Sequence, residues 1–359
     1  MTQSNVERTG KVQTVLGMVD PASLGITHTH EHIFMNGTGP YFVVHPDYPE
    51  RAEEPVSIKN RWWVEHNCNN CRDNIRFESV EEAADEVRLF QEAGGGTLVD
   101  VTNVGLGRSP EKLRALAQLT GLNLVMGGGW YVQPSHPADV AGLTDVEMAE
   151  RIVRDVQDGV DGTDIKVGLL GEVGVSVPFH DDEKKSLRAA VMAQQQTGVP
   201  ISIHPGMDDD VLLEIVEVLR AAGVDFENVI MGHLDSFGYS RETRLKVAET
   251  GCFLEFDCFG YTNFMNTETL GSAHGLPHPS DSERIDDISF FIKEGYGKKI
   301  VLSQDVFYKH VRATYGGHGY SHILRNMVPM MKSLGFTREE LDDLLIHNPQ
   351  RALTFAAPR

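Results

Sequence analysis

The sequence is short of positive charge and of long apolar runs. Its 32 lysines and arginines face 52 aspartates and glutamates, which gives a formal net charge of −20 at pH 7. Nucleic acids and anionic membrane surfaces repel such a protein, so neither is expected as a partner. No apolar stretch approaches the roughly 20 residues that a membrane-spanning helix needs. The polar opening MTQSNVERTGKVQ lacks the apolar core of a secretory signal, and it predicts a cytoplasmic protein.

Cysteine is also scarce. The chain has 4 cysteines, too few for a disulfide framework in 359 residues. Cys68 and Cys71 have the C-x₂-C spacing of half a structural zinc site, but a second pair at suitable spacing is missing. Reduced thiols in a loop are therefore the favoured interpretation, and the zinc site is the alternative.

The sequence does contain a regular alternation of short apolar runs and amphipathic stretches. The runs at 25–32, 96–102, 123–129, 164–174, 200–206, 228–235, 252–259 and 299–305 resemble strands. Helical stretches with capping signals lie between them. This alternation predicts an α/β protein with a parallel sheet, and the count of eight strands favours a closed (β/α)₈ TIM barrel. We expect one domain over residues 1–359, with a β segment at residues 10–24 packing on the barrel.

Two segments are longer than a bare barrel needs. Residues 33–78 follow the first predicted strand, and residues 260–285 follow the seventh. Both would leave from the C-terminal ends of their strands, where long ordered loops are usually lids or substrate walls. Packing against a second copy of the chain is the alternative interpretation, so a homodimer stays open.

Ionisable side chains gather at the C-terminal ends of the predicted strands. They are His30, His32, Glu172, His204, His233, Asp257 and Asp305. Taken singly, each has a structural explanation as a hydrogen-bonded core residue or a helix cap. In a barrel, however, these strand ends converge on one mouth, and so many buried charges must be paired or bound to metal. The pattern therefore predicts a metal site.

The ligand types narrow the choice of ion. Imidazole and carboxylate without thiolate suit Zn²⁺, with Mn²⁺, Fe²⁺ and Co²⁺ as alternatives. Four histidines with at least two acids exceed what one tetrahedral ion uses, whereas two ions sharing a carboxylate and a hydroxide fit such a set. Such a hydroxide is a nucleophile at neutral pH, and a neighbouring carboxylate can accept and return its proton. The pattern predicts hydrolysis of a small-molecule substrate.

Several motifs occur in the order of a known family. They are THEH at 29–32, IHPG at 203–206, GHLD at 232–235 and SQD at 303–305, together with GKVQTVLGMVDP, GTDIKVGLLGEVGVSVP and YGGHGYSHIL. From about residue 10 to residue 355 the chain resembles the phosphotriesterase family of the amidohydrolase superfamily. The likeness is closest to its phosphotriesterase-related, glutamate-bridged branch. The resemblance implies an amidohydrolase-like barrel that holds two divalent metal ions.

The resemblance also implies a ligand set: His30, His32 and Asp305 for the more buried ion, and His204 and His233 for the more exposed one. Phosphotriesterases proper bridge the two ions with a carboxylated lysine. Gly171 occupies that position here, and the adjacent Glu172 is the expected bridge. Lys166 matches a basic position deeper in the strand and is not assigned as a modified ligand. Asp305 is expected to take the proton of the hydroxide and pass it towards the leaving group.

Further residues are expected to support the ligands or contact substrate. On an ideal strand His28 shares a face with His30 and His32, so we interpret it as a supporting residue in a deeper layer. Asp235 and Asp257 are expected to orient the ligand histidines, or simply to satisfy the barrel interior.

Three aromatic or basic residues are expected nearer the substrate. Tyr131 matches a tyrosine that is typical of the lactonase branch. His318 and Tyr320 lie in the glycine-rich segment after the last strand, which could recognise a polar or anionic leaving portion. A turn held by its own hydrogen bonds is the alternative for that segment.

The reaction implied by the resemblance is hydrolysis of a carboxylic amide, ester or lactone. Amide is favoured, because the related branch is associated with N-acyl amides, including acylated amino sulfonates. Homoserine-lactone hydrolases of the family carry an arginine where this chain has Cys258, which weakens the lactonase alternative. Phosphotriesterase activity is expected to be weak at most, because the lysine bridge is missing. A mononuclear amidohydrolase, and a resiniferatoxin-type binding protein with structural metals, are the remaining alternatives.

Overall fold

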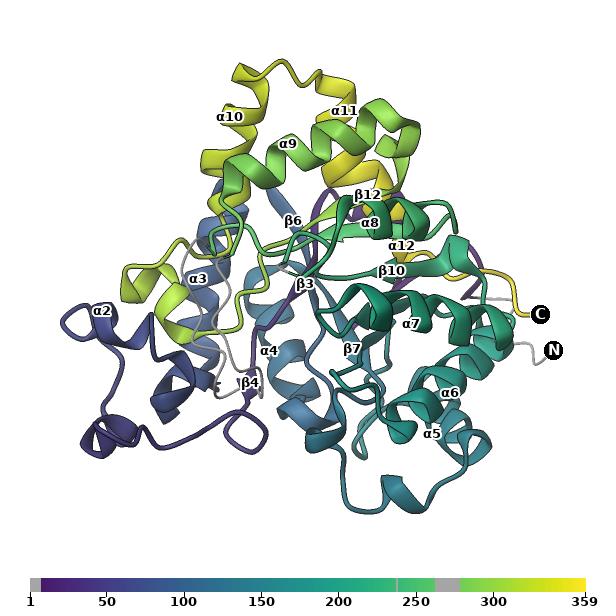
Figure 1. Ribbon diagram of the computed structural model, residues 1–359, viewed down its shortest axis with the longest axis horizontal. Helices are drawn as coiled ribbons and strands as arrows, with labels where there is room; N and C mark the ends of the chain where they lie inside the picture. Colours follow the sequence, from purple (N-terminus) through teal and green to yellow (C-terminus); the bar gives the residue numbers. More distant parts are fainter. Residues whose placement is uncertain (1–7, 237, 262–277) are drawn as a thin grey trace.

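The computed structural model describes residues 8–236, 238–261 and 278–359, and its centre is a sheet of eight parallel strands (Figure 1). Neighbours in the sheet follow the order β3, β6, β7, β8, β9, β10, β11, β12. The last strand meets the first where the Asp305 amide donates to the carbonyl oxygen of His30 at 3.1 Å. The predicted (β/α)₈ barrel is confirmed. The strand bounds are β3 (Ile26–Glu31), β6 (Gly95–Asp100), β7 (Asn123–Gly128), β8 (Leu169–Gly174), β9 (Ile201–His204), β10 (Val229–Met231), β11 (Phe253–Phe256) and β12 (Ile300–Leu302).

Every predicted strand coincides with an observed one, but most observed strands end earlier than predicted. The ladder of β10 stops at Met231, two residues before His233, and that of β12 stops at Leu302, three residues before Asp305. Several of the ionisable residues therefore lie just beyond the strands, on the first residues of the loops that form the mouth.

Helices surround the sheet (Figure 1). The capping signals in the sequence work as expected: Thr337 and Glu340 form a reciprocal capping box, and Gly198 ends α6 in the left-handed conformation at φ 75°. The helix bounds are α3 (Val80–Glu92), α4 (Pro110–Thr120), α5 (Asp145–Gln157), α6 (Asp181–Thr197), α7 (Asp209–Ala221), α8 (Arg241–Ala248), α9 (Asp281–Phe291), α10 (Val328–Ser333), α11 (Arg338–Asp342) and α12 (Asn348–Leu353). None of the helices in the described ranges is long and apolar enough to span a membrane.

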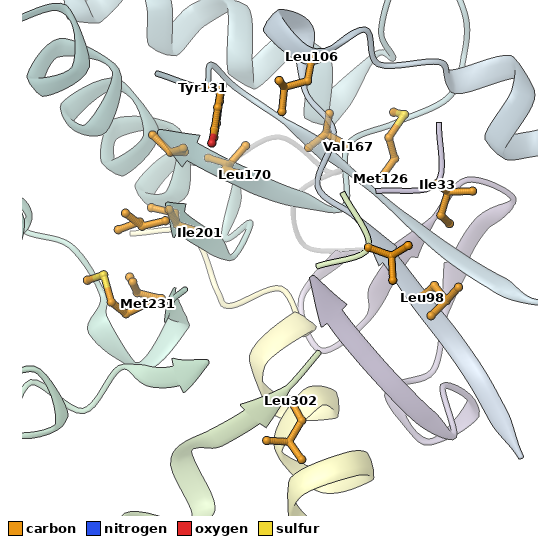
Figure 2. Packing of buried hydrophobic residues seen from close by; sticks show 14 of the residues in the cluster. Ile33, Leu98, Leu106, Met126, Tyr131, Val167, Leu170, Ile201, Met231 and Leu302 are labelled. Carbon is orange, nitrogen blue, oxygen red and sulfur yellow. The ribbon is translucent and has the colours of Figure 1, made fainter. Parts of the chain in front are cut away.

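Alternate residues of the barrel strands are buried on opposite faces of the sheet, one facing the helices and the other facing the barrel interior. Leu98, Met126, Leu170 and Leu302 belong to a large outer cluster, shown in Figure 2, that also contains residues of the surrounding helices. Their neighbours in sequence face the barrel interior and form a second, smaller cluster: Val99, Val125, Leu169, Ile230, Phe253 and Val301. This period of two is what parallel strands covered on both faces require.

The chain ends close the bottom of the barrel. A hairpin of β1 (Val12–Thr14) and β2 (Gly17–Val19) contributes Val12 to the interior cluster, and α12 contributes Ala352 and Leu353. The Gly10 amide donates to the carbonyl oxygen of Phe355, and the Phe355 amide donates to that of Lys11, both at 2.9 Å. Sealing the bottom in this way leaves the C-terminal mouth as the open end.

The long segment after β3 is ordered by its own secondary structure. It contains α2 (Arg61–Val64) and a two-stranded sheet of β4 (Met35–Asn36) and β5 (Arg76–Phe77). Cys68 and Cys71 are buried free thiols, and the Cys71 thiol lies 3.2 Å from the carbonyl oxygen of Glu54. Of the segment predicted at 260–285, residues 262–277 lie outside the described ranges.

Candidate metal centre

Four histidines and two carboxylates converge at the mouth of the barrel, around Glu172. One oxygen of Glu172 lies 3.3 Å from Nε2 of His32. Its other oxygen lies 2.9 Å from Nδ1 of His204 and 3.4 Å from Nε2 of both His30 and His233. Asp305 completes the set, with Oδ1 3.3 Å from Nε2 of His32. The six predicted ligands therefore do lie together.

The ligand atoms fall into two groups that share one carboxylate. Glu172 with His30 and His32 forms one group, and Glu172 with His204 and His233 forms the other, with all ligand atoms of a group within 4.8 Å of one another. The sharing of Glu172 is the geometry expected of a carboxylate between two cations.

Irregularities in two strands turn ligands towards the mouth. The pairing of β3 with β6 shifts register between His28 and Glu31, and the pairing of β8 with β9 shifts between Leu170 and Val173. Strict alternation would place Glu172 on the same outward face as Leu170. A bulge re-aims the side chains that follow it, and here it brings His30 and Glu172 into the barrel.

The same irregularity corrects the expectation for His28. His28 pairs in register with Leu98 of the outer cluster, and its ring lies 4.7 Å from that of Phe90 on α3. It therefore faces the helices rather than the interior that holds His30. The prediction that the three alternating histidines share a face is wrong, because the register shift lies between them.

Two of the ligands have backbone conformations that side chains rarely adopt. His233 and Asp305 have φ of 54° and 47°, in the left-handed region. The carboxylate of Asp257 accepts the His233 amide at 2.9 Å, and the His30 carbonyl accepts the Asp305 amide at 3.1 Å. Such strain persists only where the surroundings fix it, and it is common at functional sites.

The ligand histidines are oriented from behind by oxygen atoms. Asp257 places Oδ1 2.8 Å from Nδ1 of His233 and Oδ2 3.3 Å from Nδ1 of His30. Thr102 places its hydroxyl 2.8 Å from Nδ1 of His32. Asp235 in turn accepts the Asp257 amide at 3.0 Å. These contacts set which ring nitrogen of each histidine carries the proton.

Sequence reasoning missed Glu255, which also lies behind His30. Its Oε2 is 3.2 Å from Nδ1 of His30, and its side chain is fully buried on β11. A signal was present in the sequence, because Glu255 lies two residues before Asp257 and therefore on the same strand face. A charged residue in the middle of an apolar strand indicates a buried partner.

The electrostatics of the centre favour positive charge among the nitrogen atoms. Burial lowers the pKa of His32, but Asp305 and Glu172 outweigh burial and raise that pKa to about 9. Burial raises the pKa of Glu172, but the surrounding histidines outweigh it and hold the pKa well below its usual range. Within the described part of the chain, His30 Nε2, His32 Nε2 and Asp305 Oδ1 are buried without a hydrogen-bond partner. Orphaned lone pairs beside anionic carboxylates fit divalent cations.

Aromatic rings line one side of the mouth. The Tyr131 hydroxyl lies 3.2 Å from Nε2 of His204, and the rings of Tyr41 and Tyr131 have centroids 6.1 Å apart. The ring of Phe307 lies 5.3 Å from Tyr41 and 5.2 Å from His32. Tyr131 thus lies near the ligands, as predicted from the sequence. Tyr41 and Phe307 were not predicted, because they lie in loops whose sequence has no periodic pattern.

The remaining predicted residues occupy different places. Tyr320 is buried and donates to the carbonyl oxygen of His32 at 2.8 Å, so it supports the backbone of a ligand. His318 lies beside Tyr261, with ring centroids 5.8 Å apart. Lys166 precedes β8 and acts electrostatically on exposed Asp164, at the end of the strand away from the mouth. The hypothesis that Lys166 supports the ligands or contacts substrate is therefore wrong.

The barrel and its mouth define a hydrolase whose site is suited to divalent cations. The chain belongs to the phosphotriesterase family, whose model matches residues 10–353. It is 40% identical to the N-acetyltaurine hydrolase of Dictyostelium discoideum, over 97% of this chain and 99% of the relative. The chain is also 39% identical to the N-acetyltaurine hydrolase of Mus musculus, over 96% of this chain and 98% of that relative.

A solved structure is similar over the same length. The crystal structure of a resiniferatoxin-binding protein from Rhodobacter sphaeroides superposes with a TM-score of 0.91 at 33% identity, and the match covers 96% of this chain and 95% of that one. The family, the hydrolase class and the barrel predicted from the sequence are therefore confirmed.

Proposed function

We propose that the protein hydrolyses N-acyl amides with a small acyl group and an anionic amine portion, of the N-acetyltaurine type. The observation that carries the proposal is the convergence of four histidines and Asp305 at Glu172, including nitrogen and oxygen atoms without a hydrogen-bond partner in the described ranges. The two relatives named above, which are matched over nearly their full length, support the choice of bond.

The donor set fits two divalent cations, with Zn²⁺ favoured by ligand type. His30, His32 and Asp305 would hold one cation, His204 and His233 the other, and Glu172 both. When bound, such cations lower the pKa of a coordinated water and polarise a substrate carbonyl.

The aromatic side of the mouth suits the acyl group. Tyr41, Tyr131 and Phe307 present apolar rings next to the ligand histidines, and all three come from loops that follow barrel strands. Tyr41 and Tyr131 are nearly buried, at 8% and 4% exposure. Such a wall favours a group as small as acetyl, while the Tyr131 hydroxyl beside His204 can donate to a carbonyl oxygen.

Residues beyond Phe307 suit the amine portion. The Tyr261 hydroxyl donates to the carbonyl oxygen of Asp305 at 2.6 Å, and His318 lies against the Tyr261 ring. Nε2 of His318 has no hydrogen-bond partner in the described ranges, and burial lowers the pKa of this histidine to about 3, so its imidazole is neutral. A neutral imidazole can still donate one hydrogen bond to a sulfonate or carboxylate.

Asp305 is the residue placed to move a proton. Its side chain and that of His204 are the most exposed of the ligand set, at 19% and 17%, whereas Glu172 is 2% exposed. The Asp305 carboxylate can accept the proton of the attacking water and return it to the leaving nitrogen. General acid–base catalysis of this kind contributes roughly 10² to 10⁴ in rate.

The decisive test combines metal content with hydrolysis of a substrate panel. The protein is purified without chelator and offered N-acetyltaurine, N-acetyl amino acids, γ- and δ-lactones, an aryl acetate and paraoxon. We expect about two cations per chain and the highest kcat/KM for an N-acetyl amide. Asp305→Asn should lower kcat at least about 100-fold. Lactone as the best substrate would favour the lactonase alternative.

The binding-protein alternative rests on the similarity to the structure from Rhodobacter sphaeroides. A site that only binds has no need of a proton acceptor. If no substrate of the panel is hydrolysed, or if Asp305→Asn leaves the rate of hydrolysis unchanged, the hydrolase proposal is contradicted and the binding-protein alternative is favoured.

A further inference from the structure

Strand β11 and the residue after it supply none of the six expected ligands, yet two carboxylates there, on Glu255 and Asp257, lie directly behind the candidate metal centre. Glu255 and Asp257 are two positions apart, so their side chains project from one face. Phe253 belongs to the interior cluster, which identifies that face as the inside of the barrel. Both carboxylates are fully buried. Burial of two acids costs free energy unless they have a specific partner.

The two carboxylates differ in how many ligands they contact. Glu255 contacts only His30, with Oε2 3.2 Å from Nδ1. Asp257 contacts two ligands, with Oδ2 3.3 Å from Nδ1 of His30 and Oδ1 2.8 Å from Nδ1 of His233. A carboxylate that accepts the Nδ1 proton leaves the lone pair on Nε2, which is the nitrogen of each histidine that faces Glu172.

Both acids pack against the loop that presents a ligand. A Cβ at Gly232 would lie 3.4 Å from Oε2 of Glu255 and 3.4 Å from Oδ2 of Asp257, which is ordinary van der Waals contact. Gly232 immediately precedes His233, so the residue before one ligand lies against the two acids that contact the ligands from behind.

We propose that Glu255 is a positioning residue for one cation of the pair, the one held with His30, whereas Asp257 positions ligands of both cations. The proposal rests on the proposed function, because it requires two bound cations. His30 groups with His32 and Glu172, and His233 groups with His204 and Glu172, while a further group joins His30 and His233 through Asp257. Asp257 thus contacts ligands of both Glu172 groups, whereas Glu255 contacts a ligand of one.

The test compares metal affinities of variants. Wild type, Glu255→Leu, Glu255→Gln and Asp257→Asn are loaded with Zn²⁺ and titrated with a competing chelator, and the Co²⁺ forms are compared by visible absorption. We expect Glu255→Leu to weaken one of two cations by about 10- to 100-fold and to change the Co²⁺ bands of that site. Asp257→Asn should weaken both cations. Glu255→Gln keeps an acceptor oxygen and should fall between wild type and Glu255→Leu.

A control separates positioning from the loss of any buried acid. Glu183 is fully buried on α6 and accepts the Gln133 amide at 2.8 Å, away from the ligand atoms. Glu183→Gln should keep both cations at wild-type affinity even if its melting temperature falls. Equal weakening of both cations in Glu255→Leu, or none, would overturn the proposal.

Two further outcomes are decisive. Unfolding of both Glu255 variants would make this acid a folding determinant and would also overturn the proposal. A wild-type protein with at most one cation would contradict the proposed function itself, before any variant is compared.

Discussion

At the scale of single residues, the site depends on a position without a side chain. A Cβ at Gly232 would lie 2.8 Å from the carbonyl oxygen of Ile203, which is closer than real contacts allow. We expect Gly232→Ala to lower the free energy of unfolding by about 1 to 3 kcal/mol and to weaken cation binding, because β10 must move and carry His233 with it. Thermal unfolding and metal content measure both effects.

Gly142 provides the matched control, because a Cβ added there has nothing within 4 Å. Gly142→Ala should leave both the melting temperature and the metal content unchanged. A Gly232→Ala protein that behaves like Gly142→Ala would show that the loop before His233 adapts freely.

The sequence predicts which residues form the metal site better than it predicts the direction in which each side chain points. The ligands were predictable because histidines and acids recur where predicted strands end, and a family resemblance supplied their grouping. The outward direction of His28 was not predictable, because a register shift in β3 depends on pairing with β6. Glu255 was overlooked since a lone acid in an apolar strand has many explanations until its partner His30 is seen.

At the scale of elements, the loop after β3 shapes the substrate site. Tyr41 reaches the mouth from this loop, and its ring centroid lies 6.1 Å from that of Tyr131. We expect Tyr41→Ala to admit longer acyl groups, raising the ratio of kcat/KM for propanoyl over acetyl substrates by roughly 10-fold, the value of about one methylene in a pocket. Amides or aryl esters of graded chain length provide the measurement.

Tyr48 in the same loop is the control, because it is 47% exposed and its ring contacts His45 and Trp63 rather than the mouth. Tyr48→Ala should leave the chain-length ratio unchanged. The aromatic-wall assignment would be wrong if both variants gave the wild-type ratio.

Helices and strands that are marked by local sequence signals could be predicted, whereas segments held in place by contacts between distant residues could not. Thr337 and Glu340 mark the start of α11 in the sequence and form the expected cap. The arrangement of residues 33–78 has no such signals, because contacts far apart in sequence hold it: Asn74 accepts the His310 amide at 2.9 Å, and Lys309 pairs with Asp73.

At the scale of the whole molecule, cation binding and folding stability should be linked. The mouth collects carboxylates and histidines from strands all around the barrel. Removal of the cations should therefore lower the melting temperature, and added Zn²⁺ should restore it in a concentration-dependent way. When the free cation concentration is 100 times Kd, binding to the folded state raises the free energy of unfolding by about 2.7 kcal/mol. Calorimetry before and after dialysis against chelator measures the effect, and an unchanged melting temperature would contradict it.

The meeting of the chain ends beneath the barrel has a practical consequence. Gly10 and Phe355 are hydrogen-bonded neighbours on the sealed side, so the first and last described parts of the chain lie together beneath the barrel. An affinity tag, a fusion partner or a surface attachment at either end would therefore point away from the mouth. Immobilised through its ends, the enzyme would present its substrate entrance to the passing solution.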